Sequence, residues 1–118
     1  YMVRNLVAID PDNKLLAIGD MFAPGDPILF CQRDNQTALQ DLQRMLTQLK
    51  GRIGDKKPRG ALYFSCLGRG QHMFGEKSRE LEIIQEALDD VPLVGFFANG
   101  EISHDRLYGY TGVLTLFL

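Results

Sequence analysis

Two short apolar segments, residues 61–66 and 93–98, constrain the fold of this 118-residue chain more than any other feature. Each is nearly continuous in apolar residues, which is typical of a strand buried on both faces, as in a parallel sheet. Between them, residues 76–88 show a helical pattern in which Leu81 and Ile84 share one face. This order of strand, helix and strand predicts two parallel strands joined by a right-handed crossover.

Apolar periodicity and turn residues predict the remaining elements. A further helix is predicted over residues 37–50, with Asn35 or Thr37 as its N-cap. Further strands are predicted over residues 2–9, 15–18, 28–32 and 110–118. The first two of these strands would form a hairpin, and the third, fourth and fifth strands of the chain would be parallel. We therefore expect a single α/β (or α+β) domain over residues 1–118, with a mixed sheet of about six strands, two helices and the order β-β-β-α-β-α-β-β.

The composition argues against several classes of protein. Thirteen Lys and Arg residues are offset by fifteen acidic residues, so the net charge of −2 gives no electrostatic reason to expect a nucleic-acid partner. No apolar run approaches the ~20 residues of a membrane span, and no signal-peptide pattern is present. Cys31 and Cys66 both lie in apolar, strand-like runs. We expect them to be buried free thiols, which favours a reducing, cytoplasmic setting.

The loop after residues 61–66 is the first candidate for a binding site. It places Arg69 between Gly68 and Gly70 at the carboxyl end of a predicted parallel strand, where ligands gather in parallel sheets. Glycines allow positive φ and close approach of a ligand, and a guanidinium can hold a carboxylate with two parallel hydrogen bonds. The spacing matches neither a Walker A motif nor Gly-x-Gly-x-x-Gly. The alternative is a tight strand-to-helix turn with Arg69 in solvent.

The loop after residues 93–98 is the second candidate. Asn99 and Gly100 form a turn signal, and Glu101 follows directly. Glu101 has three open interpretations: a surface carboxylate, a partner of Arg69, or an acceptor for a ligand ammonium group. An arginine and a glutamate across one crevice would suit a zwitterion such as an amino acid, with Asn99 adding a hydrogen bond.

Four further residues are candidates for the lining of such a site: Cys66, His72, His104 and Tyr110. Cys66 with either histidine has the residue types of a thiol nucleophile and its base. However, Cys66 ends an apolar strand and nothing in the sequence indicates a lowered thiol pKa, so we expect no enzymatic activity. Two histidines alone make a poor metal site, and no metal is expected.

Several motifs of the chain, in order, resemble those of one known family. They are Ala61–Cys66, Gly68–Gly70, Phe74–Gly75, Glu80, Val91–Ile102 and Tyr110–Thr111. Together they resemble the C-terminal domain of the FIST family, named for F-box and intracellular signal transduction proteins. The resemblance is concentrated in the second half of the chain. Before Tyr63 it is limited mainly to the order of strands and helices.

The resemblance implies a cytoplasmic, non-enzymatic sensory domain that binds a small ligand, such as an amino acid. In the family this domain follows an N-terminal FIST domain of the same chain and is linked to a downstream signalling protein, so residues 1–118 would be excised from a longer chain. The two candidate loops are the positions that we carry over. Two alternatives remain: a protein-interaction module without a ligand, and a haem-based gas sensor, because some relatives are described as haem-binding nitric-oxide sensors. Otherwise no cofactor is implied.

Overall fold

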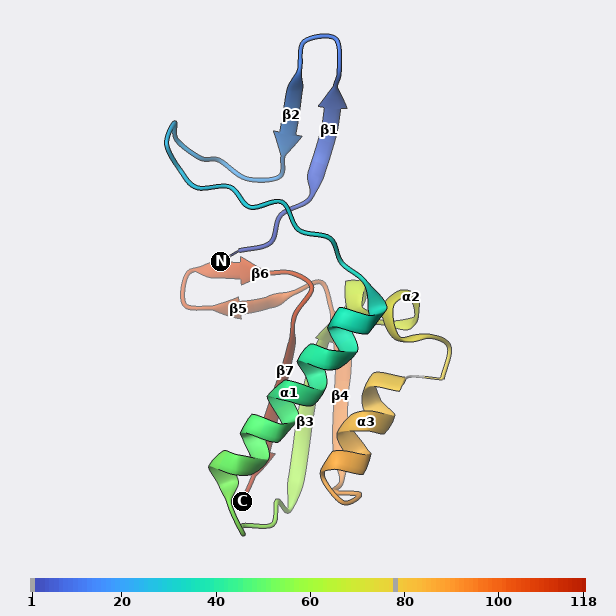
Figure 1. The fold of residues 1–118 in the computed structure, drawn as a ribbon. Coiled ribbons are helices and arrows are strands. Elements are labelled where there is room, and N and C mark those ends of the chain that lie inside the picture. The colour runs from blue at the N-terminus through green and yellow to red at the C-terminus, as the bar shows by residue number, and fades with distance from the viewer. Residues whose placement is uncertain (1, 78) are drawn as a thin grey trace. The chain divides into compact units, whose positions relative to one another are not determined.

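The structure, a computed structural model, describes residues 2–77 and 79–118. Contacts divide the chain into two compact units, residues 1–32 and 33–118, each considered by itself below. The described residues form seven short strands in three small sheets, together with three α-helices (Figure 1). The fold is mixed α/β, as predicted, but the strands do not join into the one sheet of about six strands that the sequence led us to expect.

The first unit is built on a hairpin. Strands β1 (Leu6–Asp10) and β2 (Leu15–Ile18) pair antiparallel, which confirms the predicted hairpin. The Asp10 carboxylate closes the turn by accepting hydrogen bonds from the backbone N–H of Asn13 at 3.0 Å and from its side-chain amide at 2.9 Å. Most residues of both strands are exposed, because an isolated two-stranded sheet has no second layer to cover it.

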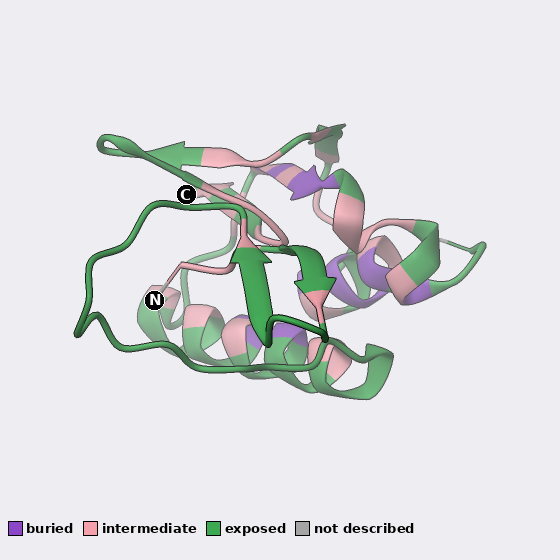
Figure 2. Cartoon of the chain, turned by 90° about the horizontal axis from the view of Figure 1, so that it is seen from above, coloured by how far each residue is buried: buried purple, intermediate pink, exposed green. Residues whose placement is uncertain are grey.

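The predicted strand at residues 28–32 does not form. This segment is irregular and exposed, because no neighbouring strand among the described residues pairs with it. The expectation that Cys31 is buried is therefore wrong, whereas Cys66 is buried as expected; both are free thiols. Figure 2 shows that the buried residues are confined to a few parts of the chain.

The second unit contains a three-stranded sheet. Its central strand is β3 (Gly60–Cys66), flanked by β4 (Leu93–Ala98) and β7 (Gly112–Phe117). Strands β3 and β4 run parallel, in register from Ala61 opposite Leu93 to Cys66 opposite Ala98, and β7 is antiparallel to β3. The predicted parallel pair is therefore confirmed, although the third predicted parallel strand is missing.

The described α-helices are the two predicted ones, with shifted ends, and one extra turn. They are α1 (Asn35–Ile53), the single turn α2 (Gln71–Phe74) and α3 (Arg79–Ala87). The N-cap of α1 is Asp34 rather than Asn35 or Thr37, since its carboxylate accepts a hydrogen bond from the Thr37 backbone N–H at 2.9 Å. A 3₁₀ turn, Leu67–Arg69, precedes α2. None of the described helices is long and apolar enough to cross a membrane.

A second hairpin lies in the chain between the sheet strands β4 and β7. Strands β5 (Glu101–Ser103) and β6 (Arg106–Tyr108) pair antiparallel in a region that the sequence analysis treated as a loop. His104 turns the chain with a φ of 58°. The pairing joins only three residues on each side, which is too short for a recognisable alternating pattern.

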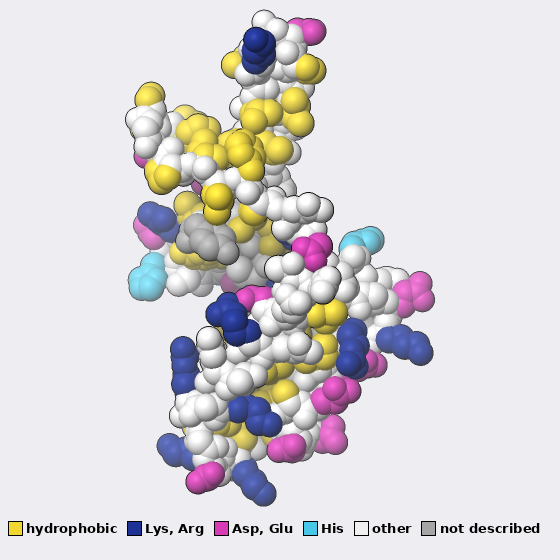
Figure 3. Space-filling view, in the orientation of Figure 1, with side chains coloured by type: hydrophobic (Ala, Val, Ile, Leu, Met, Phe, Trp, Pro, Cys, Tyr) yellow, Lys and Arg dark blue, Asp and Glu magenta, His cyan; other side chains and the backbone are white. Residues whose placement is uncertain are grey.

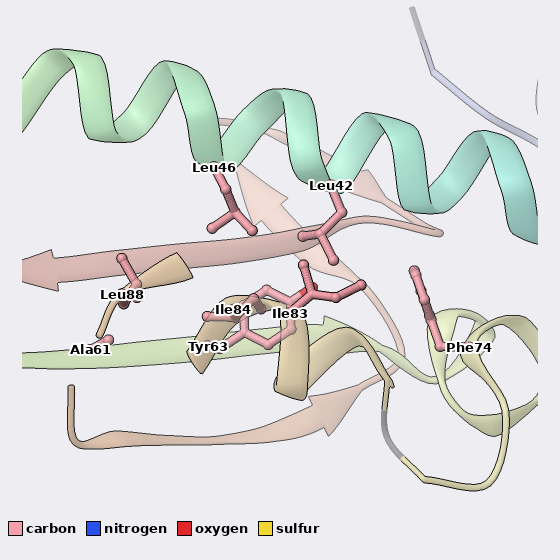
Figure 4. Close-up of a cluster of buried hydrophobic side chains, with 8 residues drawn as sticks. All are labelled: Leu42, Leu46, Ala61, Tyr63, Phe74, Ile83, Ile84 and Leu88. Atoms are coloured by element: carbon pink, nitrogen blue, oxygen red, sulfur yellow. The ribbon is translucent and has the colours of Figure 1, made fainter. Parts of the chain in front are cut away.

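Helices α1 and α3 cover one face of the sheet, and the core lies between the two layers (Figure 1). Leu42 and Leu46 point from α1 toward Tyr63, Ile83 and Ile84 (Figure 4). Charged side chains of both signs are scattered over the outward side of the helices (Figure 3). This amphipathic arrangement explains the helical periodicity seen in the sequence.

Within the second unit, no described helix covers the opposite face of the sheet. Side chains alternate between the two faces of a sheet along each strand. The side chains of Leu62 and Phe64 in β3 therefore lie on the same face as those of the residues paired with them in β4 and β7. We call this the open face; it consists of Leu62, Phe64, Val94, Phe96, Val113, Thr115 and Phe117. All but Thr115 are apolar.

Gly95 generates a prediction about the parallel pair. A Cβ atom at this position would lie 1.7 Å from the Tyr63 carbonyl oxygen, and a backbone atom in a paired strand cannot move aside. We expect Gly95→Ala to destabilise the protein at or beyond the upper end of the roughly 1–3 kcal/mol typical of overpacking. Chemical denaturation would measure this.

The matched control is Gly51→Ala in α1, where a Cβ would meet no atom within 4 Å. Alanine is the better helix former, so this variant should gain about 0.5–1 kcal/mol of stability. Equal stabilities of the two variants would contradict the packing of β4 against β3.

Candidate functional site

The two candidate loops lie side by side at one edge of the sheet. Cys66 at the end of β3 pairs in register with Ala98 at the end of β4. Because the strands are parallel, the chain leaves both of them at the same edge, where ligands gather in parallel sheets. The two strands are neighbours, which is the condition for the two loops to face one crevice.

Arg69 turns toward α3. Its Nε and Nη2 donate hydrogen bonds to Oε1 of Glu80 at 2.9 and 2.5 Å. The two side chains are only 16% and 5% exposed, so this ion pair lies largely out of water. The guanidinium carbon also lies 5.1 Å from the centroid of the Phe74 ring. The structure thus pairs Arg69 with Glu80, not with Glu101 and not with solvent.

Two further donors complete the surroundings of the Glu80 carboxylate. The Tyr63 hydroxyl donates to Oε1 at 2.6 Å, and the Ser65 hydroxyl donates to Oε2 at 3.1 Å. Both come from β3, on the face that the helices cover. We call these four residues the Glu80 network. A buried carboxylate is costly unless it is paired and hydrogen-bonded, and this network meets both requirements.

The network shifts the pKa of two of its members. Burial raises the pKa of the Tyr63 hydroxyl well above its usual value, and the hydrogen bond to Glu80 and the negative charge of Glu80 raise it further. Burial of the Arg69 guanidinium acts to lower its pKa, but attraction to Glu80 outweighs burial and leaves the pKa raised. Arg69 therefore stays charged and Tyr63 stays neutral at neutral pH.

Of the two glycines around Arg69, Gly68 is the one that the packing of the loop requires. Neither Gly68 nor Gly70 has a positive φ, contrary to the role that the sequence suggested. A Cβ on Gly68 would lie 2.7 Å from a ring carbon of Tyr110, and one on Gly70 would lie 3.4 Å from a ring carbon of Phe97. Gly68 thus lets the Tyr110 ring approach the loop closely, whereas a Cβ at Gly70 would be in ordinary contact with the Phe97 ring.

Arg33 holds the other side of this loop. Its Nη2 donates a hydrogen bond to the Gly68 carbonyl at 2.5 Å. Its guanidinium carbon lies 3.7 Å from the centroid of the Tyr110 ring, within the range of a cation–π interaction. Tyr110, predicted as a lining residue, therefore supports the loop next to the network.

The second loop folds back on the β5–β6 hairpin. Thr111 Oγ1 donates a hydrogen bond to Glu101, whose Oε1 is buried without a partner among the described residues. Gly100 has a φ of 150°, and a Cβ there would lie 2.5 Å from the Tyr108 carbonyl oxygen. Asn99 is exposed. These residues lie in the adjacent loop but line neither of the hollows described next.

A groove runs between α3 and β4. It consists of two hollows of about 330 and 240 Å³ that share Glu80, Leu81 and Phe97. We call it the α3–β4 groove. Its remaining lining residues are Tyr63, Ser65, Gln85 and residues 93–96 in the larger hollow, and Arg69, Gly70, Gln71, Gly75 and Glu76 in the smaller one. The larger hollow falls within the range of small-molecule sites, about 300–1,000 Å³.

The strand beside the groove has an unpaired edge. The Ala61 backbone N–H donates to the Pro92 carbonyl at 2.8 Å. Because backbone groups alternate along a strand, the N–H and C=O groups of Val94 and Phe96 also point to β3. Those of Leu93, Gly95 and Phe97 point the other way, and β4 has no second neighbour among the described strands. The groove thus combines a buried ion pair, apolar walls and free backbone hydrogen-bonding groups.

The other predicted lining residues lie apart from the groove. Cys66 is buried, and its backbone N–H donates to the Thr111 carbonyl at 2.9 Å. His72 and His104 are exposed residues of α2 and of the β5–β6 turn. Within the described parts of the chain, no group of three or more His, Cys, Asp or Glu residues could hold a metal ion.

The sequence analysis assigned no role to Glu80, Tyr63, Ser65 or Arg33. One signal was available for Glu80, which lies three and four residues before Ile83 and Ile84 and therefore on the buried stripe of α3. A carboxylate on an apolar stripe needs a cation and donors nearby. Tyr63 and Ser65 follow the alternation of a strand, but periodicity cannot show which face the helices cover.

Comparison with known proteins gives one family match. The model of the FIST C domain matches residues 1–104. Uncharacterized protein Rv0628c of Mycobacterium tuberculosis is 35% identical over 126 residues, covering 100% of this chain and 32% of that protein. Uncharacterized protein Mb0898c of Mycobacterium bovis is 34% identical over 122 residues, with 100% and 31% covered. The chain thus spans about a third of the length of these relatives.

A more distant similarity covers part of the chain. F-box only protein 22 of Pongo abelii is 35% identical over 75 residues, which are 63% of this chain and 18% of that protein. No solved structure matches.

The Glu80 network generates a stability prediction. Glu80→Ala would leave Arg69 as an uncompensated, mostly buried charge and would remove the acceptor for Tyr63 and Ser65. We expect a loss of about 3–5 kcal/mol, as for other broken buried pairs. Glu86→Ala on the same helix removes only an exposed contact with Arg79 and should cost less than about 1 kcal/mol. Equal losses in urea denaturation would contradict burial of the network.

The raised pKa of Tyr63 generates a prediction about alkaline pH. The folded state excludes the phenolate, whereas the unfolded chain ionises near the ordinary pKa of about 10. The stability contributed by this hydroxyl is therefore fully present below about pH 10 and is lost as the pH rises above it. The tyrosinate absorbance can be followed in an alkaline titration of the protein and of Tyr63→Phe. The difference between the two, which reports the ionisation of Tyr63, should rise only when the protein unfolds. Reversible ionisation near pH 10 with native circular dichroism would contradict this.

Proposed function

Because the chain belongs to the FIST C family, which is implicated in signal transduction, we propose that it is a sensory domain whose α3–β4 groove binds a small carboxylate-bearing metabolite such as an amino acid. The single observation that carries this proposal is the composition of the groove. It places a buried guanidinium, Arg69, beside apolar walls formed by Leu81 and Phe97. Ligand sites are typically apolar hollows with a few convergent polar groups.

Arg69 retains the capacity to bind an anion. Its Nε and Nη2 are used by Glu80, whereas Nη1 makes no hydrogen bond within the described residues. A ligand carboxylate would accept hydrogen bonds from this nitrogen in the smaller hollow, which Arg69 lines. The Glu80 carboxylate would keep the guanidinium in position, because it accepts hydrogen bonds from Nε and Nη2 of Arg69. The third nitrogen, Nη1, would then be available to the ligand.

The edge of β4 would hold the rest of the ligand. The outward carbonyls of Leu93, Gly95 and Phe97 are acceptors for an ammonium group, and the outward N–H groups are donors for a second carboxylate. An amino acid presents a carboxylate and an ammonium group at short separation, which suits a guanidinium and a strand edge in one groove. The side chain of the ligand would lie against Phe97, which is 49% exposed.

We propose binding rather than catalysis at this site. The Glu80 carboxylate, the Arg69 guanidinium and the Tyr63 hydroxyl are committed to one another, with Arg69 charged and Tyr63 neutral. A charged guanidinium and a neutral phenol orient a ligand but are unsuited to exchanging a proton with it near neutral pH. Ligand binding would instead tighten the contact between α3 and β4, and this change would be the signal.

A protein-interaction role without a ligand is the second candidate. The observation that favours it is the open face of the sheet, where Val94 and Phe96 are 66% and 65% exposed. Exposed apolar patches of this kind mark interaction sites. The open face meets the α3–β4 groove at strand β4, where Val94 and Phe96 belong to both.

The proposed ligand site can be tested by thermal unfolding in the presence of amino acids, small organic acids and haem. A ligand at about 100 times its dissociation constant stabilises by roughly 2.7 kcal/mol. For a domain near this size, each kcal/mol raises the midpoint by about 4–8 °C. We expect a selective shift with one amino acid or small carboxylate. A shift with haem alone would favour the gas-sensor alternative.

Two variants locate the site. Phe97→Ala removes a wall of the groove without touching the Glu80 network and should abolish most of the ligand shift. Phe117→Ala removes an equally exposed ring from β7, outside the groove, and should leave the shift unchanged. A shift that Phe97→Ala leaves intact, or no shift with any compound, would contradict the proposal.

A further inference from the structure

The open face carries no charged side chain on any of its three strands. Its central contact is an edge-to-face pair between the rings of Phe64 and Phe96, with centroids 4.9 Å apart. The rings and aliphatic side chains around this pair are still well exposed: Val94 is 66%, Phe117 50% and Val113 42% exposed. A contiguous surface of this composition is typical of a face that another layer covers.

The topology of the sheet leads to the same expectation. Strands β3 and β4 are a parallel pair joined by a crossover that places α2 and α3 on one face only. Parallel strands occur almost only where both faces are covered. The second layer over the open face must therefore come from outside the described residues of the sheet and its helices.

The length of the relatives indicates what that layer is. All of this chain matches a segment that makes up only 32% of the M. tuberculosis protein and 31% of the M. bovis protein. In such proteins, about two thirds of the polypeptide lies outside the matching segment and is covalently linked to it. Tethering raises the effective concentration to the millimolar range, so an attached segment would outcompete a free second copy or an unrelated protein.

We propose that the open face is an interdomain interface, which packs against an apolar surface of the same polypeptide outside residues 1–118. The covering layer would be a helical or sheet surface rich in aliphatic and aromatic side chains, because the open face offers no charge to pair with. This interface shares Val94 and Phe96 with the larger hollow of the α3–β4 groove, but the argument for it does not rest on the proposed ligand site.

Cysteine labelling tests the proposal. Val113→Cys and Thr115→Cys each place a small thiol on the open face, opposite Phe64 and Leu62 of β3, and neither residue lines the α3–β4 groove. Each is made in a Cys31→Ser background, which removes the exposed native thiol while Cys66 stays buried. Gln43→Cys on exposed helix α1 surface is the control. The variants are compared in residues 1–118 expressed alone and in the full-length gene product that contains them.

In residues 1–118 alone, both probes should react with a maleimide about as fast as the control. In the full-length protein, both should react at least about tenfold more slowly while the control is unchanged, because a covered thiol reacts only after local opening. Equal rates in the two proteins would overturn the proposal. Slow labelling in residues 1–118 alone would also overturn it. So would labelling that becomes slower as the protein concentration rises, because this would reveal a second copy on the open face. A gene product no longer than residues 1–118 would overturn it as well.

Thermal unfolding of each variant keeps the result interpretable. Both probe positions are exposed, so the substitutions should leave the unfolding midpoint of residues 1–118 close to that of the Cys31→Ser background. If one probe lowers the midpoint, the other decides the outcome. A ligand shift retained in these variants would show that the labelling result concerns the interface and not the groove.

Discussion

The buried carboxylate of Glu80 is the contact on which the rest of the second unit depends. It joins three elements: β3 through Tyr63 and Ser65, the 3₁₀ turn through Arg69, and α3 through Glu80 itself. Aliphatic packing alone would let α3 slide along the sheet, since apolar contacts are non-directional. A hydrogen-bonded ion pair fixes its register, because a shift of one residue would leave a buried charge without partners.

This contact also answers why an arginine lies between two glycines at the end of a buried strand. Gly68 and Gly70 bring the loop close to the rings of Tyr110 and Phe97, and Arg69 then reaches Glu80 from the side. Arg69 bonds Glu80 through Nε and Nη2, and the residue also lines the smaller hollow of the α3–β4 groove. One side chain thus connects the stability of the fold with the proposed recognition of a carboxylate.

Apolar periodicity and turn residues predicted those elements that depend mainly on the local sequence. The parallel strands, the β1–β2 hairpin and the long helix α1 follow from apolar runs, turn residues and helical spacing. Sequence patterns failed where contacts with other parts of the chain determine the structure. Residues 28–32 have the pattern of a strand but pair with no described strand. Residues 67–74 and 101–108 form short elements that depend on their contacts. In the candidate site, the sequence identified Arg69 but not its partner, because no periodicity shows which residues of β3 and α3 face each other.

A double-mutant cycle between Arg69 and Glu80 tests the central claim most directly. Arg69→Met and Glu80→Leu are compared singly and together by urea denaturation. The account predicts that the double variant loses less stability than the sum of the single variants, with a coupling of about 1–3 kcal/mol, because each single change strands a buried charge that the double change removes. Additivity within about 0.5 kcal/mol would mean that the two groups act independently, and it would contradict the role assigned here to the buried pair.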